Sequence, residues 1–419
     1  MKFGLFYELQ LPRPWTQDSE RQLLHDALDE LELADRLGYD IAWEVEHHFL
    51  EEYSHSSAPE VFLGAASQRT KNIRLGHGIV QLTTNHPARI AERISTLDLL
   101  SNGRVEFGMG EGSSVIELHP FGRAFRDKRE IWEDAVRCIT PMFADGPCEY
   151  HGEWFDFPMR NVLPKSHQKP HPPLWVACSQ IDTIEMAARR GMGALGFQFV
   201  SGDTAVAWVN HYYNTYLTQL DLLADYKPNP NIALVSGFMC APTDEEAIAR
   251  AEGWTFFLFA LQYYARKGAM ADEGSSIKTG SVDLWNEYLA WKQSPAGQAA
   301  GKNKGLIGSP DTLRKRLHQW EHTHVDQVIL LNQAGKTTHP DIMHSLELFA
   351  REVMPEFQAA DVKHQEWKAG VLAGEIALDK IDITPYRSKN VAAPTQKPSA
   401  RPDRNGSGPT GSPILQPVG

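Results

Sequence analysis

The chain has 419 residues, of which 42% are hydrophobic and 22% charged, and its formal net charge is −12. This apolar content is sufficient for a large buried core, so most of the chain should be globular. The negative charge argues against nucleic-acid or anionic-membrane partners, because both require a concentrated basic surface.

Strand and helix patterns alternate from the first residue to about residue 357. Residues 1–8 form a predicted strand, and Ser19 and Gln22 have the spacing of a capping box opening a helix to residue 37. Further strands are predicted at residues 41–49, 73–82, 105–108, 174–177, 194–200, 231–240 and 325–332. Helices are predicted at residues 58–69, 88–100, 128–143, 183–190, 204–223, 243–267, 308–320 and 340–352. Strands and helices in this alternation predict an α/β fold, the (β/α)₈ TIM barrel.

Two segments interrupt the alternation. Residues 145–173, after the fourth strand, are rich in proline and should be irregular, and residues 268–304, after the seventh, are rich in Gly, Ser and Lys. After the barrel domain (residues 1–357) we expect a weakly amphipathic C-terminal extension over residues 358–384. The last segment, residues 385–419, has too little apolar content to bury and is predicted to be disordered.

The second predicted strand ends in two adjacent histidines. Isoleucine, tryptophan and valine alternate with smaller or acidic residues from Ile41 to Glu46, and His47 and His48 follow. Because neighbouring side chains of a strand point in opposite directions, one histidine should be functional and the other structural. Two ordinary polar residues at a strand end are an equally good interpretation of this stretch alone.

Catalytic groups of a TIM barrel lie at the carboxyl ends of its strands. The polar or glycine positions that fall there are Glu8, His47, Gln81, residues 110–114, Cys178, Ser179, Gln198 and Asn332. Taken singly, each is more often a solvated loop residue than a functional one.

Two further patterns concern a bound nucleotide. The glycines at 108, 110 and 112 lack the spacing of the classical dinucleotide motif, and favour a loop that lets a flat ring approach the backbone. Ser179 and Thr183 stand where a strand passes into a helix, a place that attracts phosphate, and Arg129 is available to supply positive charge. An N-cap without a ligand and a surface arginine are the alternatives.

Other chemistries and compartments find little support in the sequence. No His-Glu-x-x-His or similar metal-ligand spacing and no Gly-x-Ser-x-Gly elbow is present. The chain begins without the features of a secretory signal, has no run of 18 apolar residues, and has four widely spaced cysteines. We therefore expect no metal, no membrane span and a cytoplasmic location.

Six segments, taken together in order and spacing, resemble the bacterial luciferase-like, flavin-dependent monooxygenases over roughly residues 1–357. These segments are residues 1–4, 46–49, 76–87, 99–108, 175–179 and 187–191. The resemblance implies a (β/α)₈ barrel that takes reduced FMN from a separate flavin reductase. Such an enzyme reacts the flavin with O₂ and oxygenates a small apolar or aromatic substrate through a flavin 4a-hydroperoxide.

The resemblance also assigns residues. His47 matches the family's active-site histidine, with Glu46 or Glu44 available to tune it, and residues 268–304 match a mobile lid. The flavin ring is expected against Gly78 and Ile79, where relatives carry a non-prolyl cis peptide. The cofactor-binding positions that match are Gly78, Ile79, Gly110, Glu111, Arg129, Cys178, Ser179, Thr183 and Gln198. We also expect a homodimer.

This chain departs from the family pattern at two of these positions. Luciferases proper have a cysteine where Gly110 stands, and Glu111 replaces the family's basic phosphate position, so Arg129 would have to carry the charge. Two other functions remain open: a deazaflavin-dependent oxidoreductase that transfers hydride, and a non-catalytic partner subunit. The aromatic residues from Trp254 to Tyr264, in the helix predicted over residues 243–267, are interpreted as core rather than as the wall of a substrate pocket.

Overall fold

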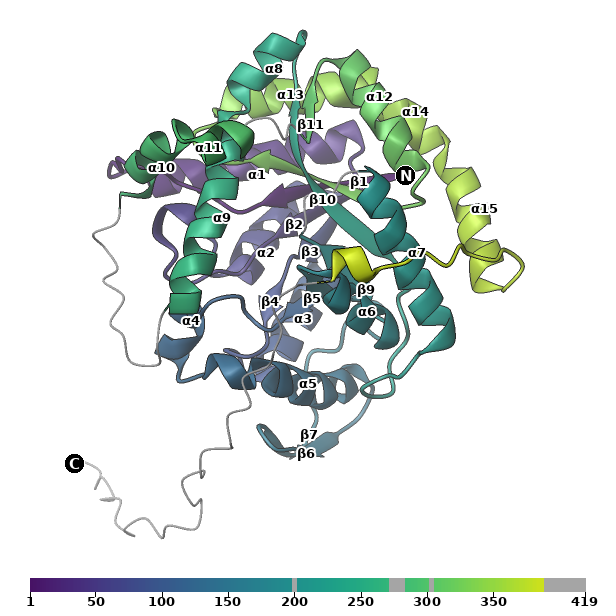
Figure 1. The fold of residues 1–419 in the computed structure, drawn as a ribbon. Coiled ribbons are helices and arrows are strands. Elements are labelled where there is room, and N and C mark those ends of the chain that lie inside the picture. The colour runs from purple at the N-terminus through teal and green to yellow at the C-terminus, as the bar shows by residue number, and fades with distance from the viewer. Residues whose placement is uncertain (198–201, 271–282, 301–304, 388–419) are drawn as a thin grey trace, which may run out of the picture. The chain divides into compact units, whose positions relative to one another are not determined.

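Parallel strands close into a barrel at the centre of the molecule (Figure 1). The computed structural model describes residues 1–197, 202–270, 283–300 and 305–387. The barrel strands, in chain order, are β1 (Lys2–Tyr7), β2 (Ile41–Glu44), β3 (Arg74–His77), β5 (Val105–Gly110), β8 (Leu174–Cys178), β9 (Gly193–Gly196), β10 (Ile232–Cys240) and β12 (Gln327–Gln333). Pairing of β9 with β10 closes the ring, with Ala194 opposite Ile232. The predicted TIM barrel is confirmed.

Both faces of the barrel strands are buried, which explains why their sequences are apolar on both sides. On β1, Phe3 and Leu5 belong to the core between the strands and the helices, whereas Phe6 belongs to the core inside the barrel. Trp43 and Trp175 meet edge to face inside the barrel, with ring centroids 5.3 Å apart. A Cβ at Gly76 would lie 2.3 Å from the Trp43 ring, so glycine is what makes room for this indole.

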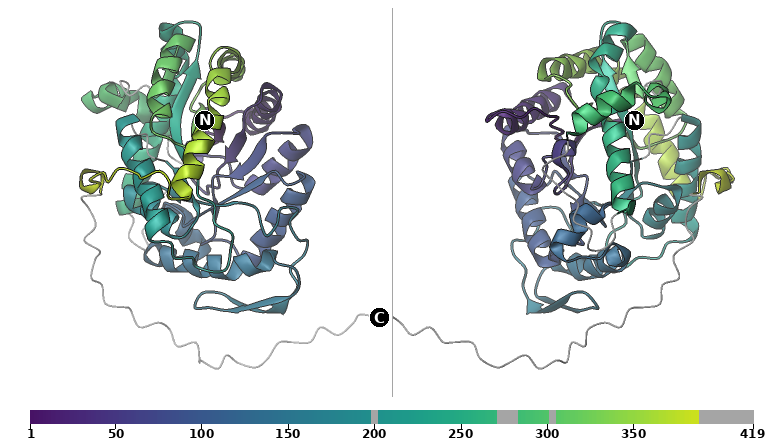
Figure 2. Two further views of the ribbon diagram at one scale, coloured as in Figure 1. Left: turned by 90° about the vertical axis from the view of Figure 1, so that its right-hand side faces the viewer. Right: turned by 60° about the vertical axis from the view of Figure 1, so that its left-hand side comes forward.

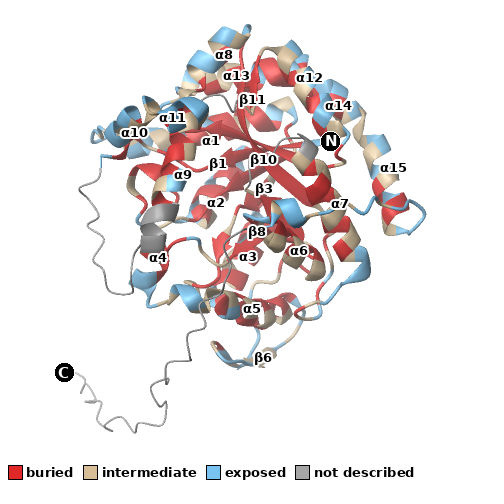
Figure 3. Cartoon of the chain, in the orientation of Figure 1, coloured by how far each residue is buried: buried red, intermediate tan, exposed pale blue. Residues whose placement is uncertain are grey.

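Helices surround the barrel (Figure 2), and each of them carries buried residues (Figure 3). They are α1 (Ser19–Leu37), α2 (Pro59–Arg69), α3 (Pro87–Leu100), α5 (Lys128–Ile139), α6 (Ile181–Arg189), α7 (Gly202–Thr218), α8 (Asp244–Arg250), α12 (Pro310–Glu321) and α13 (His339–Glu352). Thr243 caps α8 by accepting from the Glu246 amide at 3.2 Å, as the sequence predicts. The predicted capping box of α1 is wrong, because Ser19 is already the first helical residue and its hydroxyl contacts Thr16 instead.

The insertion after the fourth barrel strand is more regular than its prolines suggest. It contains an antiparallel hairpin of β6 (Cys148–His151) and β7 (Asp156–Arg160). Asp134 of α5 holds this hairpin, accepting from the Tyr150 hydroxyl at 2.6 Å and from the amides of Trp154 and Phe155. The prediction of an irregular segment is therefore wrong, because a tertiary contact with α5 compensates for the poor local propensity.

The segment that follows the seventh barrel strand, β10, contains more separate elements than the sequence pattern predicts. The single helix predicted over residues 243–267 is two helices, α8 and α9 (Glu252–Met270). Beyond α9 follow α10 (Leu284–Lys292), α11 (Pro295–Ala300) and the short strand β11 (Leu306–Gly308), which pairs with the end of β10. Residues 271–282 and 301–304 of the expected lid lie outside the described residues.

Short elements occupy several other connections and chain ends. They are η1 (Glu51–Tyr53), β4 (Val80–Gln81), α4 (Val115–Leu118), η2 (His119–Phe121), η3 (Phe125–Asp127), η4 (Thr140–Phe143) and η5 (Thr384–Tyr386). Of these, η1, β4 and α4 follow the carboxyl ends of β2, β3 and β5, and they carry residues of the site described below.

The C-terminal extension forms α14 (Met354–Ala359) and α15 (Asp361–Leu372). A buried ion cluster joins α15 to the barrel: the carboxylate of Asp326, just before β12, lies 2.8 Å from Lys368 Nζ and 2.9 Å from His364 Nε2. The tail predicted to be disordered falls, from residue 388 onward, outside the described residues. Within the described ranges, no helix combines the length and apolarity needed to cross a bilayer.

Candidate active site

A histidine between two carboxyl groups lies at the carboxyl ends of the first strands. His47, three residues beyond the end of β2, places Nδ1 2.8 Å from Glu117 Oε1 of α4 and Nε2 3.1 Å from Glu8 Oε1, which follows β1. Both carboxyl groups are almost completely buried, whereas the His47 side chain keeps 18% of its exposure. The imidazole is therefore held from both nitrogens and still reached from outside.

Two opposing effects, burial and the ion pairs, determine the pKa values of His47, Glu117 and Glu8. Burial alone would disfavour the imidazolium, but the charges of Glu117 and Glu8 outweigh it and raise the pKa of His47 well above its ordinary value. Burial would also raise the pKa of Glu117, yet the His47 charge and the hydrogen bonds from Gln81 and His48 lower it. Burial dominates at Glu8 and raises its pKa. Hence Glu117 is the anionic partner of a protonated His47, and Glu8 is the carboxyl group that protonates more easily.

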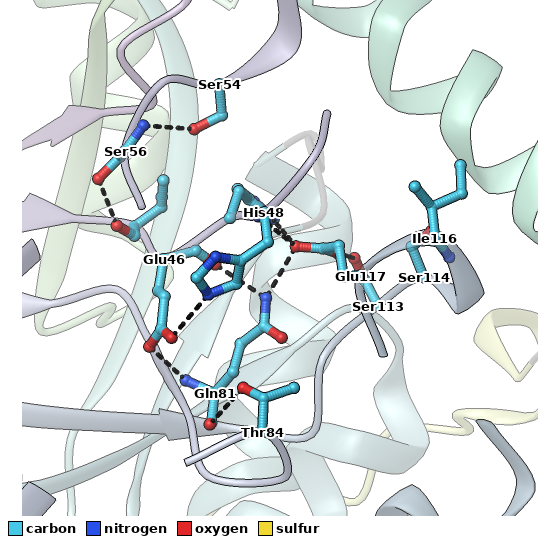
Figure 4. Close-up of polar contacts among 12 residues, drawn as sticks. Glu46, His48, Ser54, Ser56, Gln81, Thr84, Ser113, Ser114, Ile116 and Glu117 are labelled. Atoms are coloured by element: carbon cyan, nitrogen blue, oxygen red, sulfur yellow. Dashed lines mark hydrogen bonds and ion pairs between the residues drawn. The ribbon is translucent and has the colours of Figure 1, made fainter. Parts of the chain in front are cut away.

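The second histidine has a different partner. His48 Nε2 lies 3.0 Å from Glu46 Oε1, and the other Glu46 oxygen accepts from the Gln81 amide at 2.9 Å (Figure 4). Gln81 Nε2 in turn donates to Glu117 Oε1 at 2.8 Å, so this network supports the anion that holds His47. His47 and His48 do diverge, although the strand ends at Glu44, earlier than the sequence suggests.

The residues expected to tune His47 are not those that contact it. Glu46 pairs with His48, and Glu44, on the outer side of β2, accepts from the Ser56 hydroxyl. Glu117 takes that role, and sequence reasoning missed it because it is 70 residues from His47 and carries no motif of its own. Glu8 and Gln81 were identified only by their place at strand ends, and the structure places both in the network around His47 and Glu117.

An aromatic layer covers the cluster. The Tyr53 ring of η1 meets the His47 ring edge to face at 5.5 Å and stacks on Phe257 of α9 at 5.8 Å. Tyr264, also of α9, lies 5.8 Å from Tyr53. Phe257 and Tyr264 are buried, as the interpretation of these aromatics as core requires, but the core they join reaches His47. Apolar surface and an acid–base group thus lie together at the barrel mouth.

A cationic pair lies at the start of α5, near the residues expected to hold phosphate. Arg129 Nε contacts Glu111 Oε1, and Lys128 Nζ lies 3.7 Å from Glu111 Oε2. Burial raises the pKa of the Cys178 thiol, with a smaller lowering by its Thr183 contact and Arg129 and a smaller raising by Glu111, and the thiol donates to the Thr183 carbonyl at 3.3 Å. Glu111, Arg129, Cys178 and Thr183 therefore gather in one place, with Lys128 as a member that the sequence did not reveal.

Thr183 and Ser179 stand at the beginning of α6. The Thr183 hydroxyl accepts from the Gln180 amide at 3.1 Å and donates to the Gln180 carbonyl at 2.7 Å, so it caps the helix. Ser179 is exposed just before this cap. Gln198, the remaining predicted cofactor residue, lies outside the described residues. Asn332, on β12, lies in the barrel wall beside Phe6 and Tyr7 of β1.

The glycines of β5, Gly108 and Gly110, serve packing between strands. A Cβ at Gly108 would lie 1.9 Å from the His77 carbonyl oxygen, and one at Gly110 would lie 2.5 Å from Ile79 Cδ1. The missing β-carbons therefore admit the neighbouring strand and the Ile79 side chain, and the approach of a flat ring to this segment stays a prediction. Ile79 itself remains half-buried. In the described residues cis peptides precede only prolines, so the peptide between Gly78 and Ile79 is trans, unlike the one expected from relatives.

Replacing Glu117 with glutamine tests the assigned charge balance. The amide preserves the size of the side chain but carries no charge. Without the Glu117 charge, burial of the imidazole is less opposed, so the pKa of His47 should fall. Any activity that requires protonated His47 is then lost at lower pH than in the wild type, and turnover at neutral pH falls about tenfold. The measurement is an NMR titration of the His47 ring alongside the pH–rate profile.

Ser113→Ala provides a control for this variant. Its hydroxyl donates to the other Glu117 oxygen at 3.3 Å but brings no charge, so His47 should titrate nearly as in the wild type. An unchanged His47 titration in Glu117→Gln would contradict the assignment of Glu117 as its anionic partner.

The fold and the site together are typical of a TIM-barrel enzyme. An acid–base group lies at the carboxyl end of the barrel, and aromatic side chains cover it. The model of the luciferase-like monooxygenases matches residues 1–327, and the chain belongs to that family. The resemblance stated from sequence is confirmed.

Individual relatives extend over most of the chain. A 4-hydroxyprotoasukamycin monooxygenase from Streptomyces nodosus subsp. asukaensis is 34% identical, covering 86% of this chain and 93% of the relative. The oxygenase component of a flavin-dependent trigonelline monooxygenase from Acinetobacter baylyi is 26% identical, covering 86% of this chain and 97% of the relative.

Solved structures show the same fold. The oxygenating constituent of 3,6-diketocamphane monooxygenase from Pseudomonas putida, in complex with FMN, has a TM-score of 0.65 and 19% identity, covering 85% of this chain and 98% of that one. The coenzyme F420-dependent tetrahydromethanopterin reductase from Methanopyrus kandleri has a TM-score of 0.61 and 21% identity, covering 85% and 99%. The fold therefore serves both cofactor types.

Proposed function

We propose that this protein is the oxygenase component of a two-component monooxygenase that uses reduced FMN and O₂. The observation that carries the proposal is His47, held between Glu8 and Glu117 at the barrel mouth and covered by Tyr53. A protonated imidazole beside apolar surface is suited to donating a proton while water is kept away. The FMN-bound relative structure and the trigonelline relative, named an oxygenase component, support the choice of cofactor.

The residues present fit an FMN molecule. Lys128 and Arg129 offer two cations for its phosphate, and the half-buried Ile79, packed against Gly110, offers an apolar surface for its ring. When bound, reduced FMN supplies the electrons that activate dioxygen. In this arrangement His47 holds and delivers the proton from its Nε2 or Nδ1 position, Glu117 keeps His47 protonated, and the aromatic layer excludes water.

The substrate class follows from the cover of the site. Tyr53 presents its ring to His47, and Phe257 and Tyr264 extend this aromatic layer behind Tyr53, so we assign a small apolar or aromatic substrate. The reduced cofactor is supplied by a separate flavin reductase.

The test combines purified protein, a flavin reductase with NADH and FMN, air and a panel of apolar and aromatic substrates. We expect a product heavier by one oxygen atom, with label from ¹⁸O₂ and not from H₂¹⁸O, detected by mass spectrometry. Flavin oxidation without labelled product across a broad panel would count against an oxygenase.

A second candidate is hydride transfer with a deazaflavin. It is favoured by the same cluster, because a histidine between two carboxyl groups equally serves proton transfer to or from an alcohol. Titration with FMN and with a deazaflavin cofactor, followed by absorbance and fluorescence, separates the two candidates. We expect FMN to bind more tightly, and exclusive deazaflavin binding would establish the alternative.

A further inference from the structure

Glu111 occupies the cations that the proposed phosphate would need. Its two carboxylate oxygens meet Arg129 Nε and Lys128 Nζ, and its own backbone carbonyl is fixed by the Thr83 hydroxyl at 2.9 Å. The Glu111 side chain is only 14% exposed, whereas those of Lys128 and Arg129 are 26% and 40% exposed. Lys128 and Arg129 therefore contact Glu111 on their buried side, and their exposed side remains accessible to an anion from solvent.

A carboxylate and a phosphate present similar oxygen atoms to a guanidinium. An Arg129 engaged through Nε by Glu111 has fewer donors to give a second anion. A phosphate dianion that approached with Glu111 in place would also meet a negative charge among the groups that attract it. Binding of phosphate and the Glu111 ion pairs therefore compete for the same two side chains.

We propose that Glu111 is an internal competitor for the cofactor phosphate, which holds Lys128 and Arg129 in the free protein and weakens the grip on FMN. The inference rests on the proposed function, because it assumes that FMN is the ligand. Its consequence suits an oxygenase supplied by a separate reductase. Such an enzyme must take up the reduced flavin and release the oxidised flavin in every cycle, so an intermediate affinity is an advantage.

A different role for Glu111 makes the opposite prediction. If Glu111 only oriented Arg129 toward the phosphate, removing its charge would loosen Arg129 and weaken FMN binding. Competition predicts tighter binding instead, so the sign of the change decides between the two roles.

The test is Glu111→Gln, with FMN and riboflavin binding measured by fluorescence titration. We expect FMN to bind roughly three- to tenfold more tightly, with slower release in stopped flow, and riboflavin, which lacks phosphate, to bind as in the wild type. The gain should shrink at high ionic strength, because salt screens partly exposed charges.

The chain offers a matched control in Glu133, which lies on α5, the helix that carries Lys128 and Arg129. Its carboxylate also contacts two cations, Arg137 at 3.1 Å and Arg190 at 3.2 Å, and its side chain is 22% exposed. Glu133→Gln should leave FMN binding unchanged, which separates competition at Lys128 and Arg129 from a general loss of negative charge. Arg129→Met should weaken binding of FMN but not of riboflavin.

The possible results distinguish a failure of the Glu111 role from a failure of the proposed function. Unchanged or weaker FMN binding in Glu111→Gln, with FMN still bound by the wild type, overturns the role of Glu111 alone. A wild-type protein that binds neither FMN nor riboflavin overturns the proposed function and this inference with it. Tighter binding of both flavins also counts against competition for phosphate, since riboflavin has none.

Discussion

Replacing His47 with alanine should lower turnover at least about ten- to a hundredfold, because a positioned acid–base group typically contributes about 10²- to 10⁴-fold. The affinity for FMN should change little, because the phosphate is assigned to Lys128 and Arg129 at the start of α5. Loss of the imidazole removes the protonated group between Glu8 and Glu117. Product formation under saturating FMN and substrate, together with an FMN titration, measures both effects.

Two further variants make this prediction specific. His47→Gln keeps a hydrogen-bonding side chain next to Glu117 but cannot carry the charge, so its turnover should fall nearly as far as that of His47→Ala. His48→Ala is the matched neighbour, since His48 pairs with Glu46 and not with Glu8 or Glu117. We expect a smaller loss in His48→Ala. Equal activity of the His47 variants and the wild type would remove His47 from the chemistry.

Replacing Asp326 with asparagine should destabilise the fold by about 3–5 kcal/mol, the usual cost of breaking a buried ion pair. The Asp326 carboxylate accepts from the Tyr213 hydroxyl and the Ile232 amide, both at 2.7 Å, and meets Lys368 and His364 of α15. Lys368 is almost fully buried, so the variant leaves its charge without an anion. Urea unfolding measures the loss.

The pH dependence of stability gives a second readout for Asp326. Burial would raise the pKa of this carboxyl, but the Lys368 charge and the His364 contact outweigh it and lower the pKa to about 2. A depressed pKa means that the ion pairs stabilise the fold above the unfolded-state pKa, and that this contribution is lost as the pH falls toward 2. The Asp326→Asn variant should lack this component of the acid transition.

A surface pair serves as the control. Asp311 pairs with Arg314 one helical turn away, and its side chain is 85% exposed, so Asp311→Asn should change stability by no more than about 0.5 kcal/mol. We also expect limited proteolysis to release α15 earlier in Asp326→Asn. Equal stability of Asp326→Asn and the wild type would show that α15 is held by other contacts.

Periodicity and strand order allowed the barrel to be predicted from sequence. Apolar runs such as Ile232 to Cys240 are typical of strands buried on both faces, and their alternation with helices leaves few topologies. The rule that active groups lie at strand ends then identified Glu8, His47 and Gln81 correctly as neighbours.

Local propensity failed where a distant contact outweighed it. The hairpin of β6 and β7 forms in a proline-rich segment because Asp134 of α5 binds its amides and Tyr150. Likewise, the sequence pattern placed Gly110 in a loop, but Gly110 is the last residue of β5, where its missing β-carbon makes room for Ile79.

The sequence by itself determined the fold family, the position of His47 at a strand end and the place of Arg129 near the start of a helix. Only the tertiary structure decided which carboxyl groups hold His47 and which anion engages Arg129. Periodicity reports which side of an element faces the core, whereas the contacts of Glu117 and Glu111 depend on how loops from different strands converge at the barrel mouth. Those contacts turn a conspicuous pair of histidines into one protonated group, His47, and one supporting neighbour, His48.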